Sequence, residues 1–290
     1  MLLRHLVTHF LKQQAHAKFT EAMRNGAEPS PKSAPHAQPL LVDGLIVYPS
    51  DLDGGGAVDL LQEKQITHCE GLVEQTGLFG GRRVALVELG DGAVAGTRMD
   101  LALKLIKPLW IISMGFASGL LPEIRRGQFV MASRIRNERG NTLPAGLSLA
   151  AGQSPPPGIH WGDLLTVESL PTTPEEKKAF AASGAAAWDA DSYYTATAVA
   201  GATTFISVRI VSEADGDELP KGVKVIRDQK SFAAKLGAAT GALLDQPSSL
   251  ATMWKMRDEA IKLSDRLGKF LLGVVEQLPR REPTNADTKI

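Results

Sequence analysis

Residues 109–121 place the strongest constraint on the fold. The segment begins with bulky apolar residues, as a buried strand does, and continues from 114 to 119 with mostly small residues. We expect the strand to end near residue 113 and the small residues to form a loop whose main-chain N–H groups are open to a polar ligand. A tight turn that needs small residues for packing explains the same pattern. A second short strand is expected at 128–133.

Apolar, strand-like runs alternate with helical periodicity over most of the chain. The expected strands lie at 44–48, 71–76, 83–89, 109–113, 128–133, 164–170 and 204–211, and the expected helices at 57–63, 93–107, from 174 onward and at 192–200. Residues 53–56 are expected to form a loop and residues 77–81 a hairpin turn. This alternation predicts an α/β fold, a three-layer αβα sandwich with a central mixed sheet.

The two ends of the chain follow other patterns. Residues 1–25 predict a basic amphipathic helix, which could lie on an anionic membrane surface or, as the favoured interpretation, pack on its own domain or on a partner subunit. Residues 26–39 contain four prolines and are typical of a linker. We expect the α/β domain at 40–246, a long amphipathic helix at 247–278 and a disordered tail at 279–290. The apolar stripe of the last helix suits a core contact or a homodimer contact.

The composition excludes several classes of protein. Because the formal net charge is zero, nothing favours nucleic acid as a partner. Cys69 is the single cysteine, which excludes an internal disulfide and a cysteine-rich metal site, and no other metal-ligand spacing is present. We therefore expect no metal and no cofactor. No apolar run approaches the roughly 20 residues that span a bilayer, and polar residues interrupt any signal peptide, so a cytoplasmic location is the default expectation.

Acidic residues gather where the expected strands and helices begin or end. The three groups are Asp51 and Asp53 after the strand at 44–48, Asp189 and Asp191 before the helix at 192–200, and Glu213, Asp215, Asp217 and Glu218 after the strand at 204–211. Ligands of open α/β sheets bind at the carboxyl ends of strands, so these groups could converge on one pocket. Aspartate is also common at helix N-caps and in turns, and each group alone has that structural explanation.

Four short motifs occur in a characteristic order. They are Gly90-Asp91-Gly92 before a helix, Ser-Met-Gly-Phe-Ala-Ser-Gly-Leu at 113–120, Asp-Ala-Asp-Ser at 189–192 and Ser-Val-Arg-Ile-Val-Ser-Glu at 207–213. In this order and spacing they resemble the nucleoside phosphorylase superfamily, and within it the branch of the methylthioadenosine/S-adenosylhomocysteine nucleosidases. The resemblance covers residues 44–245 and leaves out both terminal helices.

The resemblance implies cleavage of the N-glycosidic bond of a purine nucleoside through an oxocarbenium-like state. It places the carboxylate that positions the nucleophile at Asp53 and the acid that protonates the departing purine at Glu213. Asp189 and Asp191 match the acid pair that binds ribose, with Asp191 on the sugar hydroxyls. The implied substrate-binding residues are Gly92, Ser113, Gly115, Phe116, Ala117, Asp189, Ala190, Asp191, Arg209 and Ser212.

These roles agree with the chemistry of the bond. A purine anion leaves poorly at neutral pH, so a proton from Glu213 lowers the barrier. Nearby carboxylates stabilise the positive charge that develops on the ribose. A further carboxylate can orient and deprotonate a water molecule. His160 and Trp161 follow a proline-rich loop, where a contact with the base and simple packing are both open.

The loops indicate which nucleophile is used. Residues 49–54 contain no arginine, and the loop at 89–92 adds Asp91. Arg98 lies well inside the expected helix at 93–107. Two like charges about 4 Å apart repel by roughly 4 kcal/mol at an effective dielectric of 20, so phosphate beside Asp91 would be costly. Water is the expected nucleophile, and a phosphate-dependent phosphorylase is the alternative.

Three acidic positions depart from the pattern of the nucleosidases. Those enzymes usually carry Glu where this chain has Asp53, a Met-Glu pair where it has Ala190 and Asp191, and Asp where it has Glu213. Each exchange moves a carboxylate by about one bond length, roughly 1.5 Å. A catalytically impaired relative that binds nucleosides or acts as a scaffold is therefore a further alternative, and an ordinary α/β protein with coincidental acids is another.

Overall fold

The computed structural model describes residues 38–69, 71–147, 149, 152–169, 171, 174–199, 201, 203–214 and 247–282. The helix expected at 1–25 and most of the linker at 26–39 lie outside the described residues. Asp215, Asp217 and Glu218 also lie outside them, as does the tail from residue 283 onward.

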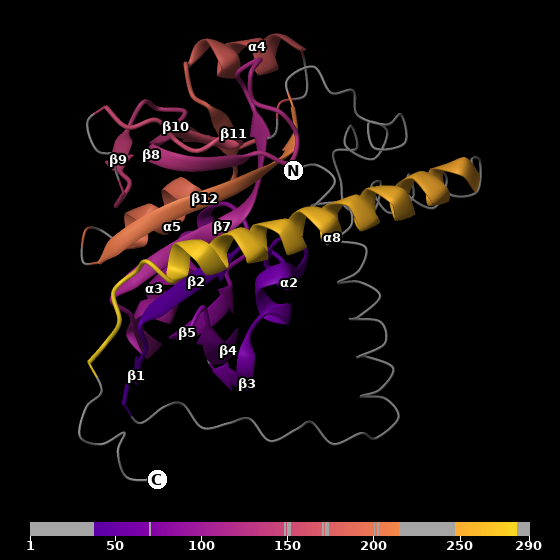
Figure 1. Cartoon of the computed structure of the whole chain (residues 1–290). Helices are drawn as coiled ribbons and strands as arrows, with labels where there is room; N and C mark the ends of the chain where they lie inside the picture. Colours follow the sequence, from indigo (N-terminus) through magenta and orange to yellow (C-terminus); the bar gives the residue numbers. More distant parts are fainter. Residues whose placement is uncertain are drawn as a thin grey trace.

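A mixed sheet forms the centre of the molecule (Figure 1). Its strands run in the order β11 (Ala187–Asp189), β10 (Ile159–Thr166), β8 (Phe129–Asn137), β12 (Thr204–Glu213), β7 (Trp110–Gly119), β2 (Gly44–Tyr48), β5 (Arg82–Glu88), β4 (Leu72–Phe79) and β3 (Gln62–Cys69). β9 (Thr142–Pro144) pairs with β8, and β1 (Leu40–Leu41) pairs with β6 (Ile106–Lys107) in a separate small sheet. Because β2, β5, β7 and β12 run parallel to one another, their carboxyl ends lie on the same side.

One half of the sheet closes on itself. β11 pairs in parallel with β10 and also antiparallel with β7, where Trp188 lies opposite Ser118. β7, β12, β8, β10 and β11 therefore form a ring of strands. The antiparallel pairing carries Asp189, the last residue of β11, back toward the middle of β7.

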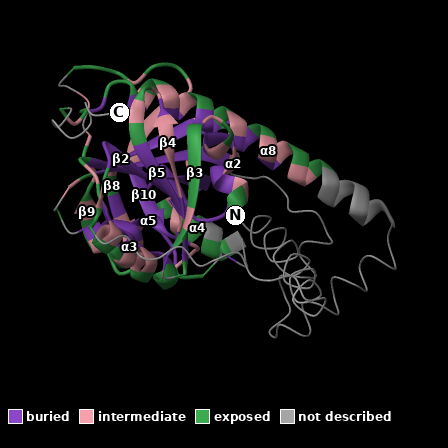
Figure 2. Ribbon diagram, turned by 90° about the horizontal axis from the view of Figure 1, so that it is seen from below, coloured by how far each residue is buried: buried purple, intermediate pink, exposed green. Residues whose placement is uncertain are grey.

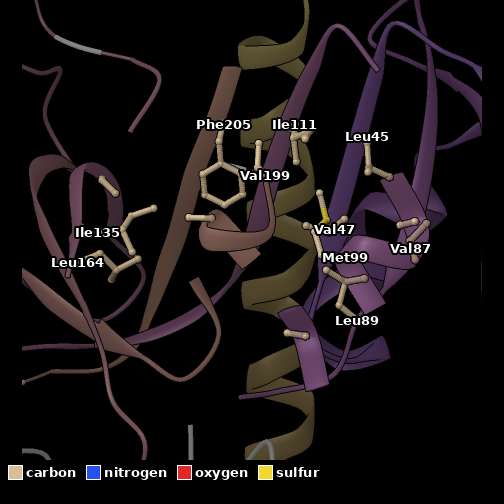
Figure 3. Packing of buried hydrophobic residues seen from close by; sticks show 14 of the residues in the cluster. Leu45, Val47, Val87, Leu89, Met99, Ile111, Ile135, Leu164, Val199 and Phe205 are labelled. Atoms are coloured by element: carbon tan, nitrogen blue, oxygen red, sulfur yellow. The ribbon is translucent and has the colours of Figure 1, made fainter. Parts of the chain in front are cut away.

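Helices pack on both faces of the sheet. α2 (Asp51–Asp59) and α8 (Pro247–Val275) lie on one face, where Leu267 and Leu271 of α8 join the apolar side chains of β2, β5, β7 and β12. α3 (Ala93–Leu105) and α5 (Ser192–Val199) lie on the other face. Figure 3 shows this second core, which includes Met99 of α3 and Val199 of α5. α4 (Pro174–Ala182) packs through Phe180 against Trp188. The central strands are buried and the edge strand β3 is largely exposed (Figure 2).

Several boundaries expected from the sequence are wrong. β7 continues through Gly119 and is buried along its whole length, so residues 114–119 are strand and not loop. The strand persists because β12 pairs with β7 as far as Ser118 and satisfies main-chain groups that a loop would expose. Residues 53–56 belong to helix α2 and are not a loop. Residues 62–69 form strand β3, although a helix was expected to reach residue 63. The hairpin turn falls at Gly80 and Gly81, both with positive φ.

The glycines of α2 are explained by close packing. A Cβ at Gly54 would lie 2.4 Å from the ring of Tyr48, and a Cβ at Gly56 would lie 2.2 Å from the main-chain oxygen of Ser264 in α8. Each glycine costs a helix about 1 kcal/mol relative to alanine. α2 therefore depends on its contacts with β2 and α8 to remain helical.

α8 shares its core with the sheet and anchors the segment that follows it. In the described part of α8, five apolar side chains are buried, namely Ala260, Leu263, Leu267, Leu271 and Val275. The Nε1–H of Trp110 donates to the carbonyl of Pro279 at 2.9 Å, and the main-chain N–H of Arg281 donates to Asp43 at 2.6 Å. Across the part of the chain that the structure describes, no helix is both long and apolar enough to cross a membrane.

Candidate active site

The site begins where β2 ends and β7 continues. β2 pairs with β7 only as far as Val47 and Ser113, after which the chain turns into α2. Beyond that point the main-chain N–H of Phe116 donates to Oδ1 of Asp53 at 2.9 Å. The Asp53 carboxylate thus replaces the missing strand as the hydrogen-bond partner of β7.

Asp53 is completely buried and held on two sides. The hydroxyl of Ser50 donates to Oδ2 of Asp53 at 2.5 Å. A Cβ at Gly115 would lie 3.1 Å from Oδ1, so the small residue leaves room for the carboxylate beside β7. Ser50 precedes the helix as its N-cap, yet its hydroxyl contacts the Asp53 side chain and makes no capping bond to the main chain.

A buried arginine links the second acidic group to β7. Arg209 on β12 donates through Nε to Oδ2 of Asp189 at 2.9 Å and through Nη2 to Oδ2 of Asp191 at 2.8 Å. The same guanidinium donates to the carbonyl and the hydroxyl of Ser113, at 2.9 and 3.0 Å. One side chain therefore ties β11, the start of α5 and β7 together.

The charges around Arg209 are arranged to keep it protonated. Burial disfavours its charge, but the carboxylates of Asp191 and Asp189 outweigh this effect and raise the pKa of Arg209 above its ordinary value. Asp53 acts in the same direction. A permanently positive guanidinium thus lies among three carboxylates.

Asp189 is held in place by several hydrogen-bond donors. Asp189 accepts from Arg209, from the hydroxyl of Thr166 at 2.7 Å and from the hydroxyl of Ser192, and it also receives the main-chain N–H groups of 191 and 192 at 3.4 Å. Both of its oxygens are engaged by the protein, and the residue is fully buried. It acts as the cap of α5 and as the partner of Arg209.

A β-bulge sets the direction of Glu213. Val211 lies opposite Ala117, but Glu213 lies opposite Ser118, so Ser212 is an extra residue in β12. The hydroxyl of Ser118 donates to Oε2 of Glu213 at 3.2 Å, and the hydroxyl of Ser212 donates to the carbonyl of Ala117 at 3.3 Å. Without the bulge, Glu213 would point to the same face as Arg209. Glu213 is half-buried, whereas Asp53 and Asp191 are buried.

The glycine loop before α3 completes the cluster. The main-chain N–H of Gly92 donates to the carbonyl of Ala190 at 3.0 Å, which places the loop beside Asp189 and Asp191. The side chain of Arg98 folds back toward this loop, since a Cβ at Gly90 would lie 3.6 Å from its Nη1. The sequence interpretation placed Arg98 away from the loop, and the structure brings its guanidinium near.

The catalytic and substrate-binding residues implied by the resemblance join one network around residues 113–118 of β7, whereas Asp51 of the first acidic group is exposed. Asp53, Arg209 and Glu213 reach it from three different elements, and Asp191 reaches it through Arg209. His160 and Trp161 lie at the start of β10, where Nε2 of His160 contacts Gln128 at 2.9 Å and Trp161 packs into the core under α8. Within the described ranges, no group of His, Cys, Asp and Glu is arranged to hold a metal ion.

Three serines around the carboxylates were missed by sequence reasoning. Ser50 stands three residues before Asp53, a spacing that resembles a capping box and could have been noticed. Ser118 lies inside the motif at 113–120 but was not assigned a contact. Ser264, whose hydroxyl donates to the carbonyl of Asp53 at 3.1 Å, is 211 residues away along the chain and gives no local signal.

Comparisons with known proteins agree with this architecture. No family model matches the chain. A stretch of 99 residues is 31% identical to the 5′-methylthioadenosine/S-adenosylhomocysteine nucleosidase of Desulfotalea psychrophila and spans 34% of this chain and 40% of that protein. The match therefore covers less than half the length of that relative.

Solved structures extend the likeness over most of the chain. The 5′-methylthioadenosine/S-adenosyl homocysteine nucleosidase of Campylobacter jejuni superposes with a TM-score of 0.60 and 9% identity, over 82% of this chain and 100% of the other. The futalosine hydrolase of Helicobacter pylori superposes with a TM-score of 0.58 and 11% identity, over 82% and 98% of the two chains. The resemblance expected from the sequence is thus confirmed, and the protein has the mixed α/β fold of these nucleosidases.

Proposed function

We propose that this protein, which has the fold of the methylthioadenosine/S-adenosylhomocysteine nucleosidases, hydrolyses the N-glycosidic bond of a purine nucleoside of that kind. The observation that carries the proposal is the convergence of Asp53, Asp191 and Glu213 on residues 113–118 of β7. Helices on both faces of the sheet support the three-layer form of the fold as well.

Glu213 is the residue best suited to protonate the departing base. An acid that gives up its proton in every turnover must regain one from solvent, and Glu213 is the only one of the three that is not fully buried. The hydroxyl of Ser118 donates to Oε2 and holds the carboxyl group of Glu213 at the end of β12. The departing base then leaves toward solvent.

Asp191 is assigned to the sugar and Asp189 to its support. Arg209 takes one oxygen of each carboxylate, and Asp189 is further engaged by Thr166 and Ser192. Asp189, Asp191 and Asp53 all lie close enough to Arg209 to raise its pKa. Carboxylates gathered in this place favour a ribose that becomes positive as the bond breaks.

Asp53 is assigned to the water molecule. Ser50 and Phe116 hold its carboxylate in one orientation, so little reorganisation is needed when it accepts a proton from water. Its position is on the α2 side of β7, whereas Glu213 lies at the end of β12. This separation matches the need to place water and leaving group apart.

A phosphorylase is the second candidate, and one contact favours it. Arg98 lies near Gly90, in the loop that would face a phosphate nucleophile. Asp91 in the same loop and the acidic residues at 51 and 53 oppose an anion there. Water therefore remains the proposed nucleophile. An impaired relative that only binds nucleosides is the remaining alternative, because the three carboxylates differ in length from those of the nucleosidases.

Release of free base tests the proposal. The protein is incubated with methylthioadenosine, S-adenosylhomocysteine, adenosine and inosine, with and without phosphate, as wild type, as Glu213→Gln and as the control Glu168→Gln. Glu168 is exposed and pairs with the exposed Arg139, so the control removes a surface carboxylate outside the network around β7. Hydrolysis without phosphate that falls about 100-fold or more in Glu213→Gln alone would support a nucleosidase.

The other outcomes identify the alternatives. Strict dependence on phosphate would support a phosphorylase and give Arg98 a role. No release from any substrate would contradict the enzymatic proposal and favour a binding role. A homodimer and a cytoplasmic location remain our predictions, and light scattering on the purified protein tests the first of them.

A further inference from the structure

Ser264 connects the C-terminal helix α8 to the helix that carries Asp53. Its hydroxyl donates to the carbonyl of Asp53 at 3.1 Å and accepts from the main-chain N–H of Gly56 at 2.9 Å. The side chain is buried, and its partners lie 211 and 208 residues earlier in the chain. One hydroxyl therefore bridges two main-chain groups of the same turn of α2.

The turn that Ser264 bridges has little intrinsic stability. Gly54, Gly55 and Gly56 follow Asp53 directly. Glycine lowers the stability of a helix more than any residue except proline. The hydrogen bonds within α2 alone therefore hold Asp53 weakly. A helix that must keep a carboxylate within a fraction of an ångström needs support from outside.

α8 approaches α2 closely enough to give that support. A Cβ at Gly268 would lie 2.5 Å from the main-chain carbon and oxygen of Gly56, so the two helices touch through main-chain atoms. Gly273, further along α8, has no atom within 4 Å of the corresponding position. The contact at Gly268 is thus a specific feature of this crossing and not of glycines in α8 generally.

We infer that Ser264 is a positioning residue for Asp53, so that α8 is part of the apparatus that orients the nucleophile. The expected effect of Ser264 on turnover rests on the proposed function. The claim that Ser264 holds the turn of α2 does not. If Ser264 fixes the turn of α2, its loss releases the Asp53 carboxylate from the N–H of Phe116. The amide of Phe116 then reports on the position of Asp53 whether or not the protein is an enzyme.

The test compares Ser264→Ala with Lys262→Ala, an exposed position two residues earlier on α8. Hydrogen exchange is followed at the amide of Phe116 and at that of Ile46 in the middle of β2, and kcat and KM are measured for base release. We expect Ser264→Ala to lower kcat by about ten-fold or more, because a shift of 1 Å can cost about 100-fold. KM should change by less than about two-fold, because Ser264 does not reach the sugar-binding residues.

Exchange at Phe116 should become about ten-fold faster in Ser264→Ala, while Ile46 stays as in the wild type. Gly268→Ala, which forces α8 away from α2, should show the same pattern, and Gly273→Ala should resemble the wild type. Equal acceleration at Phe116 and Ile46 would mean general loosening and would overturn the inference. So would wild-type kcat in Ser264→Ala.

An inactive wild type would refute the proposed function and leave the second readout intact. In that case selective acceleration at Phe116 would still support Ser264 as the residue that positions Asp53. Unchanged exchange at Phe116 would overturn the inference separately from the proposed function.

Discussion

The carboxylate of Asp53 accepts a hydrogen bond from the main-chain N–H of Phe116 at 2.9 Å, 63 residues further along the chain. This contact lies where β2 has ended and β7 would otherwise show an unpaired N–H in a buried place. The acid expected to orient the nucleophile is therefore also the group that completes the sheet. The proposed catalytic position and the local stability of β7 therefore depend on the same side chain.

Asp53→Asn should separate these two roles. The amide oxygen can still accept from Phe116, so the fold should be kept, but the side chain can no longer take a proton from water. We expect base release to fall about 100-fold or more. Steady-state kinetics on all four nucleosides check this result.

Asp51→Asn is the matched control for Asp53→Asn. Asp51 is exposed in the same turn of α2, and the same change there should leave turnover close to that of the wild type. If both variants lose activity equally, then activity depends on the negative charge at the start of α2 and not on the contact between Asp53 and Phe116. The assignment of Asp53 to the water molecule would then be wrong.

Arg209→Met should be the most destabilising single change near the site. It leaves the carboxylates of Asp189 and Asp191 buried without their cation, and breaking such a pair costs about 3–5 kcal/mol. Arg209→Lys keeps a charge but lacks the fork that reaches both acids, so it should lose less stability and still lose activity. Urea unfolding followed by circular dichroism measures both variants.

Arg139→Met is the control for the loss of stability in Arg209→Met. Its salt bridge with Glu168 is exposed on both sides, so its removal should change stability little. An unfolding free energy for Arg209→Met close to that of Arg139→Met would contradict a buried cluster of one guanidinium and two carboxylates.

The acidic residues of the site could be found from the sequence because their signals are local. Asp189 and Asp191 stand two residues apart, and Glu213 follows Arg209 and Ser212 in one short motif. Their separate surroundings are set by strand pairings that no local pattern contains. The antiparallel contact of β11 with β7 brings Asp189 under Arg209, and the bulge at Ser212 turns Glu213 toward Ser118.

The glycines after Asp53 show the opposite case. Three glycines in a row favour a loop by propensity, and the sequence interpretation followed that preference. The structure makes them helical because Tyr48 lies against Gly54 and α8 lies against Gly56. The contact of Gly56 with Ser264 spans 208 residues, so no local pattern in the sequence could have predicted it.

Gly54→Ala and Gly55→Ala should therefore have opposite effects. A Cβ at Gly54 meets the Tyr48 ring at 2.4 Å, and such overpacking costs about 1–3 kcal/mol. A Cβ at Gly55 has Ser264 Oγ as its nearest contact at 3.8 Å, so alanine there should stabilise α2 by up to about 1 kcal/mol. Thermal unfolding of the two variants measures the difference. Equal shifts in Tm would contradict the packing of α2 against β2.

Tyr48 provides a prediction about pH. The residue is buried at the end of β2, and its hydroxyl accepts a hydrogen bond from Gln75 at 3.2 Å. Burial, followed by the negative charges of Asp51 and Glu88, raises the pKa of Tyr48 well above its ordinary value. The folded protein therefore keeps this phenol neutral at a pH where the unfolded chain ionises it.

The sign of the effect follows from the proton balance. Below about pH 10 the phenol is neutral in both states and contributes its full stability. As the pH rises above about 10 towards the pKa of the folded state, the unfolded chain binds fewer protons. The free energy of unfolding should then fall by up to about 1.4 kcal/mol per pH unit.

Tyr48→Phe should remove this part of the alkaline slope, and Tyr194→Phe should remove much less, because Tyr194 is far less buried. Urea unfolding between about pH 9 and 11 checks the three proteins. Identical slopes in the wild type and Tyr48→Phe would show that the phenol is not buried against α2 and β4.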